Sequence, residues 1–181
     1  MGLDITAYSK LKKLDVLFNS DGEPVDPVTR EPVDQYYRVR ENNDFPGRAD
    51  GLEDGACYSY DESEYVFARS YAGYAVWRET LARLAGYPLY SFINALGVQE
   101  NSRAASAWHG KVPDGAPFVE LVNFSNCEGV IGPVVAAKLL RDFVEFDDRA
   151  KDIVDDRFYS GYCQLKRGLE LAADGGALEF S

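Results

Sequence analysis

The stretch EYVFARSYAGYAVWRETLARLAGYP (Glu64–Pro88) decides the fold class, because its hydrophobic period changes partway along. Its first seven residues are rich in aromatic and β-branched side chains, which favours a β-strand. After Gly73 the apolar side chains recur at i, i+3, i+7 and i+10, the spacing of one helix face. These side chains are Tyr74, Trp77, Leu81 and Leu84. Gly86 and Pro88 then end the predicted helix.

Strands are predicted on both sides of this stretch. Alternation and β-branched or aromatic composition favour strands at Leu3–Tyr8, Gln35–Arg40, Ala56–Asp61 and Phe118–Phe124, with a terminal strand in Ala177–Ser181. The strand at Glu64–Ser70 is expected to form a hairpin with Ala56–Asp61. The Pro- and Asp-rich segment Phe18–Asp34 predicts a loop or a protruding hairpin. Loops are expected at Glu41–Gly55 and Gln99–Pro117.

Three further helices follow from the same 3.6-residue period. Leu89–Leu96 has helical spacing and ends at Gly97. Pro133 suits the first turn of a helix whose buried stripe contains Val135, Leu139, Phe143 and Phe146. The last helix begins near Asp155, turns Phe158, Tyr162, Leu165 and Leu169 inward, and stops at Gly175–Gly176. Without a regular βαβ alternation, the chain predicts an α+β fold: a single domain, residues 1–181, with a mainly antiparallel sheet and about four helices.

Composition narrows the classes of function. The 181 residues carry a net charge of -11, so a direct contact with DNA or RNA is not expected. No apolar run is long enough to span a bilayer, and we expect a cytoplasmic protein without membrane contact. Three cysteines and one histidine give no metal-site spacing, so neither a metal nor a cofactor is expected. The acidic surface suits a protein partner with a basic surface, although acidity also serves solubility.

The turn NFSNCEGVIGP (Asn123–Pro133) is the first candidate functional site. Asn123, Ser125, Glu128 and Gly129 can line a ligand there, since free N–H groups before a helix favour an anion. The same residue types also suit a plain strand-to-helix turn. A catalytic Cys127 would need His109, the single histidine, as its base. We expect no catalytic residue, and read this segment mainly as a turn.

Two other segments carry candidate ligand-binding residues. In FPGRADGLEDG (Phe45–Gly55), Arg48 stands between glycines and can present its guanidinium to a carboxylate or phosphate. The acids of that loop lack a cation-binding spacing and are expected to be solvated. Trp77 and Arg78 can form a stacking pocket for a base or sugar, although their helical spacing also suits the core.

Several segments together resemble a family of uncharacterised small proteins from tailed phages and prophage regions. They are MGLDITAYS, FPGRADG, GYAVWR, LAGYP and NFSNCEGVIGP, and they lie in order across most of the chain. The resemblance implies an intracellular, phage-associated accessory protein and transfers no catalytic residue. Such a setting implies a protein that binds and inhibits a host factor, with ligand sequestration and virion assembly as other roles.

Three functions compete on these grounds. The first is a non-catalytic protein that docks an acidic face, Asp147, Asp148, Asp155 and Asp156, on a basic surface of a partner. The second is a module that binds a nucleotide or another anionic small molecule, with the loops around Arg48 and Gly129 converging near Trp77 and Arg78. The third is a hydrolase that uses Cys127 or Glu128. Partner binding is the function that we expect.

Overall fold

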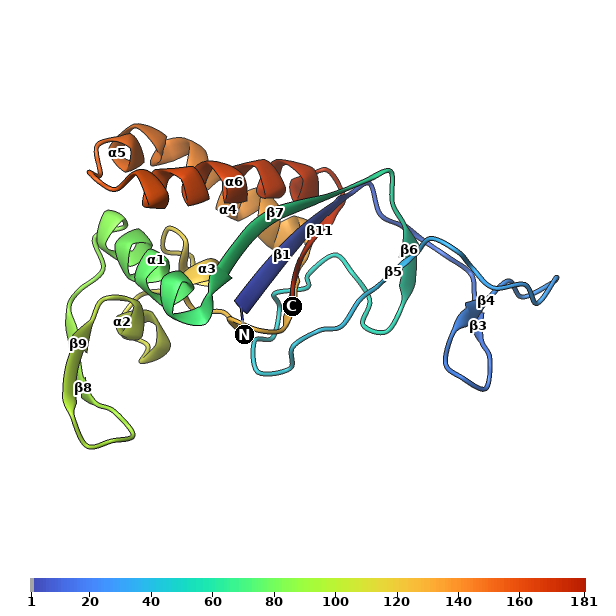
Figure 1. Cartoon of the computed structure of the whole chain (residues 1–181), viewed down its shortest axis with the longest axis horizontal. Coiled ribbons are helices and arrows are strands. Elements are labelled where there is room, and N and C mark those ends of the chain that lie inside the picture. Colours follow the sequence, from blue (N-terminus) through green and yellow to red (C-terminus); the bar gives the residue numbers. More distant parts are fainter. Residues whose placement is uncertain (1) are drawn as a thin grey trace.

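The computed structural model describes residues 2–181, and its centre is a four-stranded antiparallel sheet (Figure 1). The strand order is β10–β11–β1–β7, so the two chain ends pair with each other in the middle of the sheet. The strands are β1 Gly2–Ser9, β7 Glu62–Ser70, β10 Gly129–Ile131 and β11 Ala177–Phe180. In β1, Leu3, Ile5 and Ala7 are buried on one face, as their alternation predicts.

Six helices are present in residues 2–181, and together with the antiparallel pairing they confirm the α+β class. They are α1 Tyr71–Leu84, α2 Ala104–Trp108, α3 Val119–Val122, α4 Pro133–Glu145, α5 Asp147–Lys151 and α6 Asp156–Ala173. The expected number of about four is therefore wrong, because α2, α3 and α5 are too short to show a period. In Figure 1, α4, α5 and α6 form a layer along one side of the sheet.

Helix α6 lies unusually close to the sheet because glycines face it. A Cβ at Gly161 would come within 2.9 Å of the Phe67 ring, and one at Gly168 within 2.8 Å of Val66. Both distances are shorter than ordinary carbon contacts, so only glycine fits here. The stripes predicted for α1, α4 and α6 are buried in the same core.

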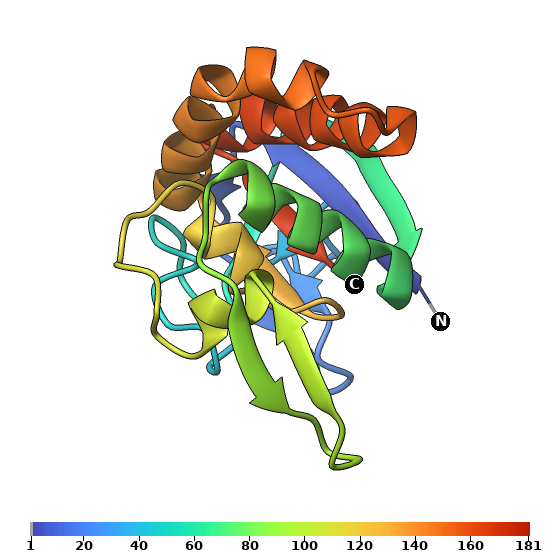
Figure 2. The same ribbon diagram turned by 90° about the vertical axis from the view of Figure 1, so that its left-hand side faces the viewer.

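Smaller sheets extend the molecule at both ends. Strands β2 Lys12–Lys13, β5 Tyr37–Arg38 and β6 Cys57–Ser59 form a second antiparallel sheet. Strands β3 Leu17–Phe18 and β4 Pro24–Val25 form the protruding hairpin predicted within Phe18–Asp34. Strands β8 Tyr90–Ile93 and β9 Gln99–Ser102 form another hairpin, which projects from the opposite end (Figures 1 and 2).

The β8–β9 hairpin overturns two sequence predictions. Leu89–Leu96 was expected to be a helix, and Gln99–Pro117 a loop; the first contains β8, and the second contains β9 and α2. The apolar spacing of the first segment is helical by coincidence, since Leu89, Ile93 and Leu96 are exposed instead of sharing a buried face. Asn94 accepts backbone hydrogen bonds from Leu96 and Val98 and so stabilises a turn.

Two other local predictions are also wrong. Phe118–Phe124 was expected to be a strand but contains helix α3; its short apolar run is buried on all sides, a pattern that strands and buried helices share. Phe118 enters the helix with φ at 62°, and its N–H donates to Asp142 at 2.8 Å. The expected hairpin of Ala56–Asp61 with Glu64–Ser70 does not form, because β6 pairs with β2 and β5 whereas β7 pairs with β1.

Candidate functional site

The turn NFSNCEG connects α3 to β10 and is held by its own side chains. The Ser125 hydroxyl accepts hydrogen bonds from the N–H groups of Cys127 (3.3 Å) and Glu128 (3.2 Å). The Asn42 side chain donates to the Glu128 carbonyl oxygen at 3.0 Å. Gly129 has φ at 127°, and a Cβ there would come within 2.9 Å of Asn42. The small polar residues of this turn therefore shape its backbone.

Two arginines predicted to bind a ligand converge on this turn as clamps of its backbone. Arg48 Nε donates to the Glu120 carbonyl oxygen at 3.0 Å, and its Nη2 donates to that of Asn123 at 3.1 Å. Arg78 Nη1 donates to the Phe124 carbonyl oxygen at 2.7 Å. The segments around Arg48, Arg78 and Gly129 do meet, as the ligand-binding hypothesis requires. However, the hydrogen bonds that both arginines make in residues 2–181 go to main-chain oxygens.

Arg78 is an uncommon buried charge. Its guanidinium lies 4.7 Å from the Tyr74 ring centroid and 5.2 Å from that of Trp108, and its side chain is 3% exposed. Burial lowers the pKa of Arg78, and no carboxylate lies within ion-pair distance among the described residues. The aromatic faces and the Phe124 carbonyl oxygen stabilise the cation in place of a counter-ion.

Trp77 belongs to the core. It is 1% exposed, its Nε1 donates to the Phe158 carbonyl oxygen at 3.1 Å, and its ring packs on Tyr74, Phe67 and Phe158. A ring enclosed in this way has no free face for a base or sugar. Trp77 is therefore a core residue of α1, which is the alternative that its helical spacing also indicated.

Cys127 and His109 have separate surroundings. The Cys127 thiol lies 3.6 Å from the Ser125 hydroxyl, whereas the His109 ring packs on Tyr90 and Phe92 of the β8–β9 hairpin. No hydrogen bond joins the two side chains in the described structure. Of the three cysteines, Cys57 is buried, whereas Cys127 and Cys163 are exposed.

A pocket of about 390 Å³ opens beside the turn. Its polar lining residues are Tyr37, Arg40, Cys127, Glu128, Glu179 and Ser181, and Gly129 and Phe180 complete the wall. Tyr37 stacks on Tyr8 at 4.4 Å between ring centroids, and the Tyr8 hydroxyl donates to Glu179 at 3.0 Å. The Tyr37 hydroxyl is buried and finds no hydrogen-bond partner among residues 2–181.

Burial, and then the nearby Glu179 carboxylate, raise the pKa of both tyrosines above the ordinary value, so both hydroxyls keep their protons. The sequence predicted only Glu128 and Gly129 of this pocket. Tyr37 and Glu179 are far apart in the chain and belong to different sheets; they meet through Tyr8, whose ring stacks on Tyr37 and whose hydroxyl donates to Glu179, a tertiary contact with no local signal.

The four predicted partner-binding aspartates differ in how far their carboxylates are already engaged by hydrogen bonds and ion pairs. Both carboxylate oxygens of Asp147 are engaged, with Lys151 at 2.6 Å and Lys166 at 3.4 Å. The hydrogen bond from Lys151 is the main cause of the lowered pKa of Asp147. Asp155 caps α6 by accepting from Phe158 N–H and Arg157 N–H. Asp148, Asp155 and Asp156 are all exposed, and Asp148 Oδ1 lies 3.3 Å from Lys151 Nζ.

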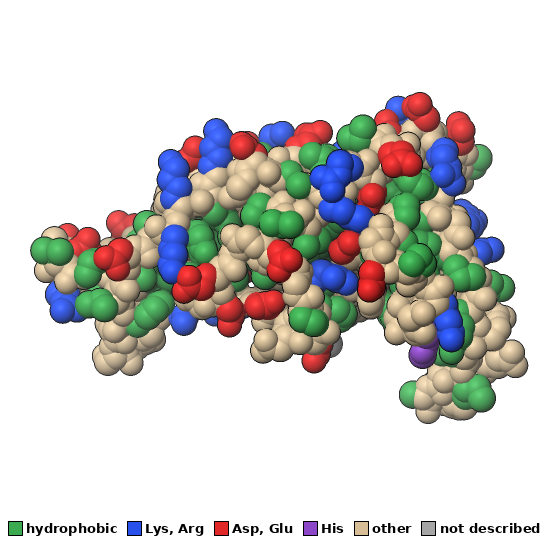
Figure 3. Space-filling model, turned by 180° about the vertical axis from the view of Figure 1, so that it is seen from behind, with side chains coloured by type: hydrophobic (Ala, Val, Ile, Leu, Met, Phe, Trp, Pro, Cys, Tyr) green, Lys and Arg blue, Asp and Glu red, His purple; other side chains and the backbone are tan. Residues whose placement is uncertain are grey.

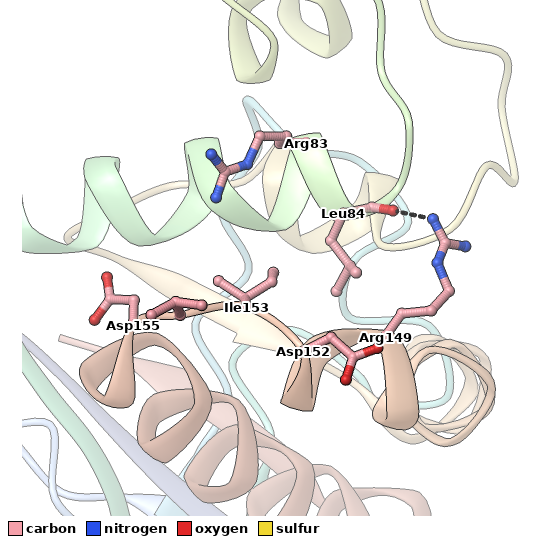
Figure 4. A pocket seen from close by; sticks show the side chains of 7 residues that line it. Arg83, Leu84, Arg149, Asp152, Ile153 and Asp155 are labelled. Carbon is pink, nitrogen blue, oxygen red and sulfur yellow. Dashed lines mark hydrogen bonds between the residues drawn. The ribbon is translucent and has the colours of Figure 1, made fainter.

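Of these four aspartates, Asp155 lines a broad groove of about 710 Å³ between the end of α1 and the α5–α6 connection (Figure 4). Arg83 and Asp155 face the groove from opposite sides, while Arg149 donates to the Leu84 carbonyl oxygen at 2.8 Å. The groove therefore mixes both signs of charge. Figure 3 likewise shows acidic and basic side chains interspersed over one face of the molecule.

The β8–β9 hairpin carries a group of exposed apolar side chains outside these pockets. Four of its side chains are more than half exposed: Leu89 (58%), Ile93 (73%), Leu96 (86%) and Val98 (55%). Its tip projects from the body of the molecule, and Figure 2 shows the two strands extending well beyond α1 and α2. Sequence reasoning missed this surface because it assigned Leu89, Ile93 and Leu96 to a buried helix stripe.

Among residues 2–181, histidine, cysteine, aspartate and glutamate do not gather in any group of three or more that could hold a metal ion. Within the same range, every helix is too short or too polar to cross a bilayer.

No family model matches the chain, and neither a curated protein nor a solved structure matches it.

Proposed function

We propose that this protein acts by binding another protein, with the β8–β9 hairpin as the central contact. The observation that carries the proposal is the exposure of Leu89, Ile93, Leu96 and Val98 on a projecting hairpin. Exposed apolar side chains that occur singly need no explanation, but a group of them on a projecting element, with Ile93, Leu96 and Val98 at its tip, is typical of an interaction site.

The turn of the hairpin is fixed by hydrogen bonds, so its tip is already ordered for binding. Asn94 Oδ1 accepts from Leu96 N–H at 2.9 Å and from Val98 N–H at 3.0 Å, and its Nδ2 donates to Glu100 at 2.6 Å. Asn94 N–H also donates to the Val98 carbonyl oxygen at 2.9 Å. The tip side chains are thus ordered before a partner arrives, which lowers the entropic cost of association.

The base of the hairpin is anchored to the body of the protein. The Glu79 carboxylate of α1 accepts from the Ser102 hydroxyl at 2.6 Å and from Arg103 N–H at 2.9 Å. On the inner face, the Tyr90 and Phe92 rings pack beside His109. Since a lone hairpin is only marginally stable in water, these contacts are what keep the arm in place.

The chemistry of the chain also favours one kind of partner. An apolar recess would receive Ile93, Leu96 and Val98, and basic side chains around it would be attracted by the net charge of -11. The exposed Asp148 and Asp156 contribute to that field. Inhibition of a host factor by a phage-encoded protein is one setting for such binding, and it stays a prediction.

Comparative capture tests the proposal. Tagged wild type, Leu96→Asp and a control, Val144→Asp on the exposed face of α4, are used to capture proteins from a lysate of the source cell. Val144 is 59% exposed and lies outside the hairpin, so its variant controls for an added surface charge. We expect a protein that wild type and the control retain, that Leu96→Asp loses, and that elutes between 0.1 and 0.5 M salt as charges are screened.

A partner retained equally by Leu96→Asp would show that the hairpin tip is not the contact. A lysate that yields no partner specific to wild type would contradict partner binding itself. The circular dichroism and thermal midpoint of each variant show whether it is folded.

A further inference from the structure

The pocket beside the NFSNCEG turn contains a buried polar group that the fold leaves unused. Tyr37 is 4% exposed, lines the pocket, and its hydroxyl has no hydrogen-bond partner within residues 2–181. A buried hydroxyl without a partner costs free energy, and the great majority of such groups are satisfied. An unsatisfied hydroxyl in the wall of an open pocket is therefore placed to meet a ligand atom.

The charges around this hydroxyl define what the ligand must carry. Glu179 uses one oxygen, Oε2, to accept from Tyr8, which leaves the other oxygen for a donor. Glu128, the turn residue immediately before β10, supplies a second carboxylate to the lining. Arg40 is the one cation in the lining and makes no ion pair among the described residues. Two anions and one cation favour a ligand with both a positive and a negative group.

We propose that this pocket binds a small zwitterion of the amino-acid class, with its ammonium near Glu179 and Tyr37 and its carboxylate near Arg40. An ammonium has three N–H donors, and the free Glu179 oxygen and the Tyr37 hydroxyl are acceptors for two of them. The planar guanidinium of Arg40 matches a carboxylate with two parallel hydrogen bonds. Glu128 adds favourable charge for the ammonium without a defined contact.

The size of the pocket agrees with a ligand of this class. Its volume, about 390 Å³, falls near the lower end of small-molecule pockets. Tyr37 gives the lining one aromatic ring, which is fixed by stacking on Tyr8 at 4.4 Å between ring centroids. The proposal is independent of partner binding, because none of these residues belongs to the β8–β9 hairpin.

The first test measures the thermal midpoint of the protein with each of the twenty protein amino acids at 10 mM. At least one is expected to raise the midpoint by several degrees, since ligand binding to the folded state alone stabilises it. Its N-acetyl derivative, which lacks the ammonium, and its amide, which lacks the carboxylate, should give less than half of the shift. Glu179→Gln should weaken binding at least tenfold and Tyr37→Phe about threefold or more, while Glu145→Gln on α4 should bind as wild type does.

Cys127 supplies a second readout that does not depend on stability. In a Cys163→Ser background Cys127 is the single exposed thiol of residues 2–181, since Cys57 is buried. Iodoacetamide alkylation of Cys127, followed by mass spectrometry, should slow at least threefold when the amino acid occupies the pocket. If none of the twenty shifts the midpoint or protects Cys127, or if the N-acetyl form works equally well, the proposal is wrong.

Discussion

Glu79 is expected to be the residue on which the β8–β9 arm most depends, although it lies outside the arm. Its carboxylate accepts from the Ser102 hydroxyl (2.6 Å), from Arg103 N–H (2.9 Å) and from Ala104 N–H (3.0 Å). Helix α2 has no capping side chain at Arg103, so Glu79 takes that role from the neighbouring helix. One side chain thus joins α1, the end of β9 and the start of α2.

The magnitude follows from those three donors. Glu79→Ala removes the acceptor of all three, and because the site is only half-buried, water replaces part of what is lost. At about 1 kcal/mol for each hydrogen bond, the free energy of unfolding should fall by about 3 kcal/mol. For a chain of this length that lowers the thermal midpoint by about 6–12 °C. Glu79→Gln keeps one acceptor without the charge and should lose about 1–2 kcal/mol.

The loss should depend on pH in a defined direction. Burial raises the pKa of Glu79, but hydrogen bonds from Ser102, Ala104 and Arg103 outweigh it and hold the pKa below its ordinary value. A carboxyl group whose pKa is depressed by folding stabilises the protein fully above its unfolded pKa, about 4.3, and loses that contribution as pH falls through the folded value. The difference between wild type and Glu79→Gln should therefore be largest at pH 7 and shrink below about pH 4.

Urea unfolding at pH 7 and pH 3.5 measures this difference, with Glu145→Gln as the matched control for an exposed glutamate on a helix. The control should change the free energy of unfolding by no more than about 0.5 kcal/mol. If Glu79→Gln behaves as the control does, or if its deficit is the same at both pH values, the carboxylate does not anchor the arm as the structure indicates.

Three further predictions concern the Lys138 ion pairs, the backbone at Gly129 and the buried Arg78. Lys138→Met leaves Glu120 (2.6 Å) and Asp142 (2.9 Å) without their cation, so the free energy of unfolding measured in urea should fall by about 2–4 kcal/mol, and an unchanged value would contradict the contact. Gly129→Ala forces a Cβ onto a backbone at φ 127° and should lower the free energy of unfolding by about 2–4 kcal/mol in the same assay. An unchanged value would show that the backbone relaxes and would contradict this prediction. Arg78→Met should cost less than Arg78→Ala by at least about 1 kcal/mol, because it fills the space between the rings without a buried charge; the reverse order in thermal midpoints would refute this reasoning.

The long helices could be predicted because the apolar residues that recur with helical spacing are the same residues that pack into the core. In α1, Tyr74, Trp77 and Leu81 are at most 1% exposed, and their spacing alone indicates one buried face. The same reasoning failed at Leu89–Leu96, where equally good spacing belongs to exposed side chains of a hairpin. The local turn chemistry of Asn94 and Gly97 decided the outcome there, and a period count does not include it.

The candidate site could be predicted only in part, and for a different reason. The sequence indicated Arg48 and the turn at Gly129 as contacts for an anion and Arg78 as part of a stacking pocket, and the structure does bring their segments together. A sequence does not show which backbone carbonyl oxygen a donor will find. Tyr37 and Glu179 become neighbours only when the second sheet packs beside the first, with Tyr8 between them.

The clamps explain how an irregular turn can still present side chains in a fixed direction. Arg48 and Arg78 hold the carbonyl oxygens of Asn123 and Phe124 from one side, and Asn42 holds that of Glu128 from the other. Since the main chain is fixed on both sides of Cys127, its thiol and the Glu128 carboxylate keep their places in the pocket wall. These three side chains do not line the pocket, but they fix the backbone of residues that do. A ligand of the proposed kind would then bind with a smaller loss of conformational entropy, because the wall is already ordered.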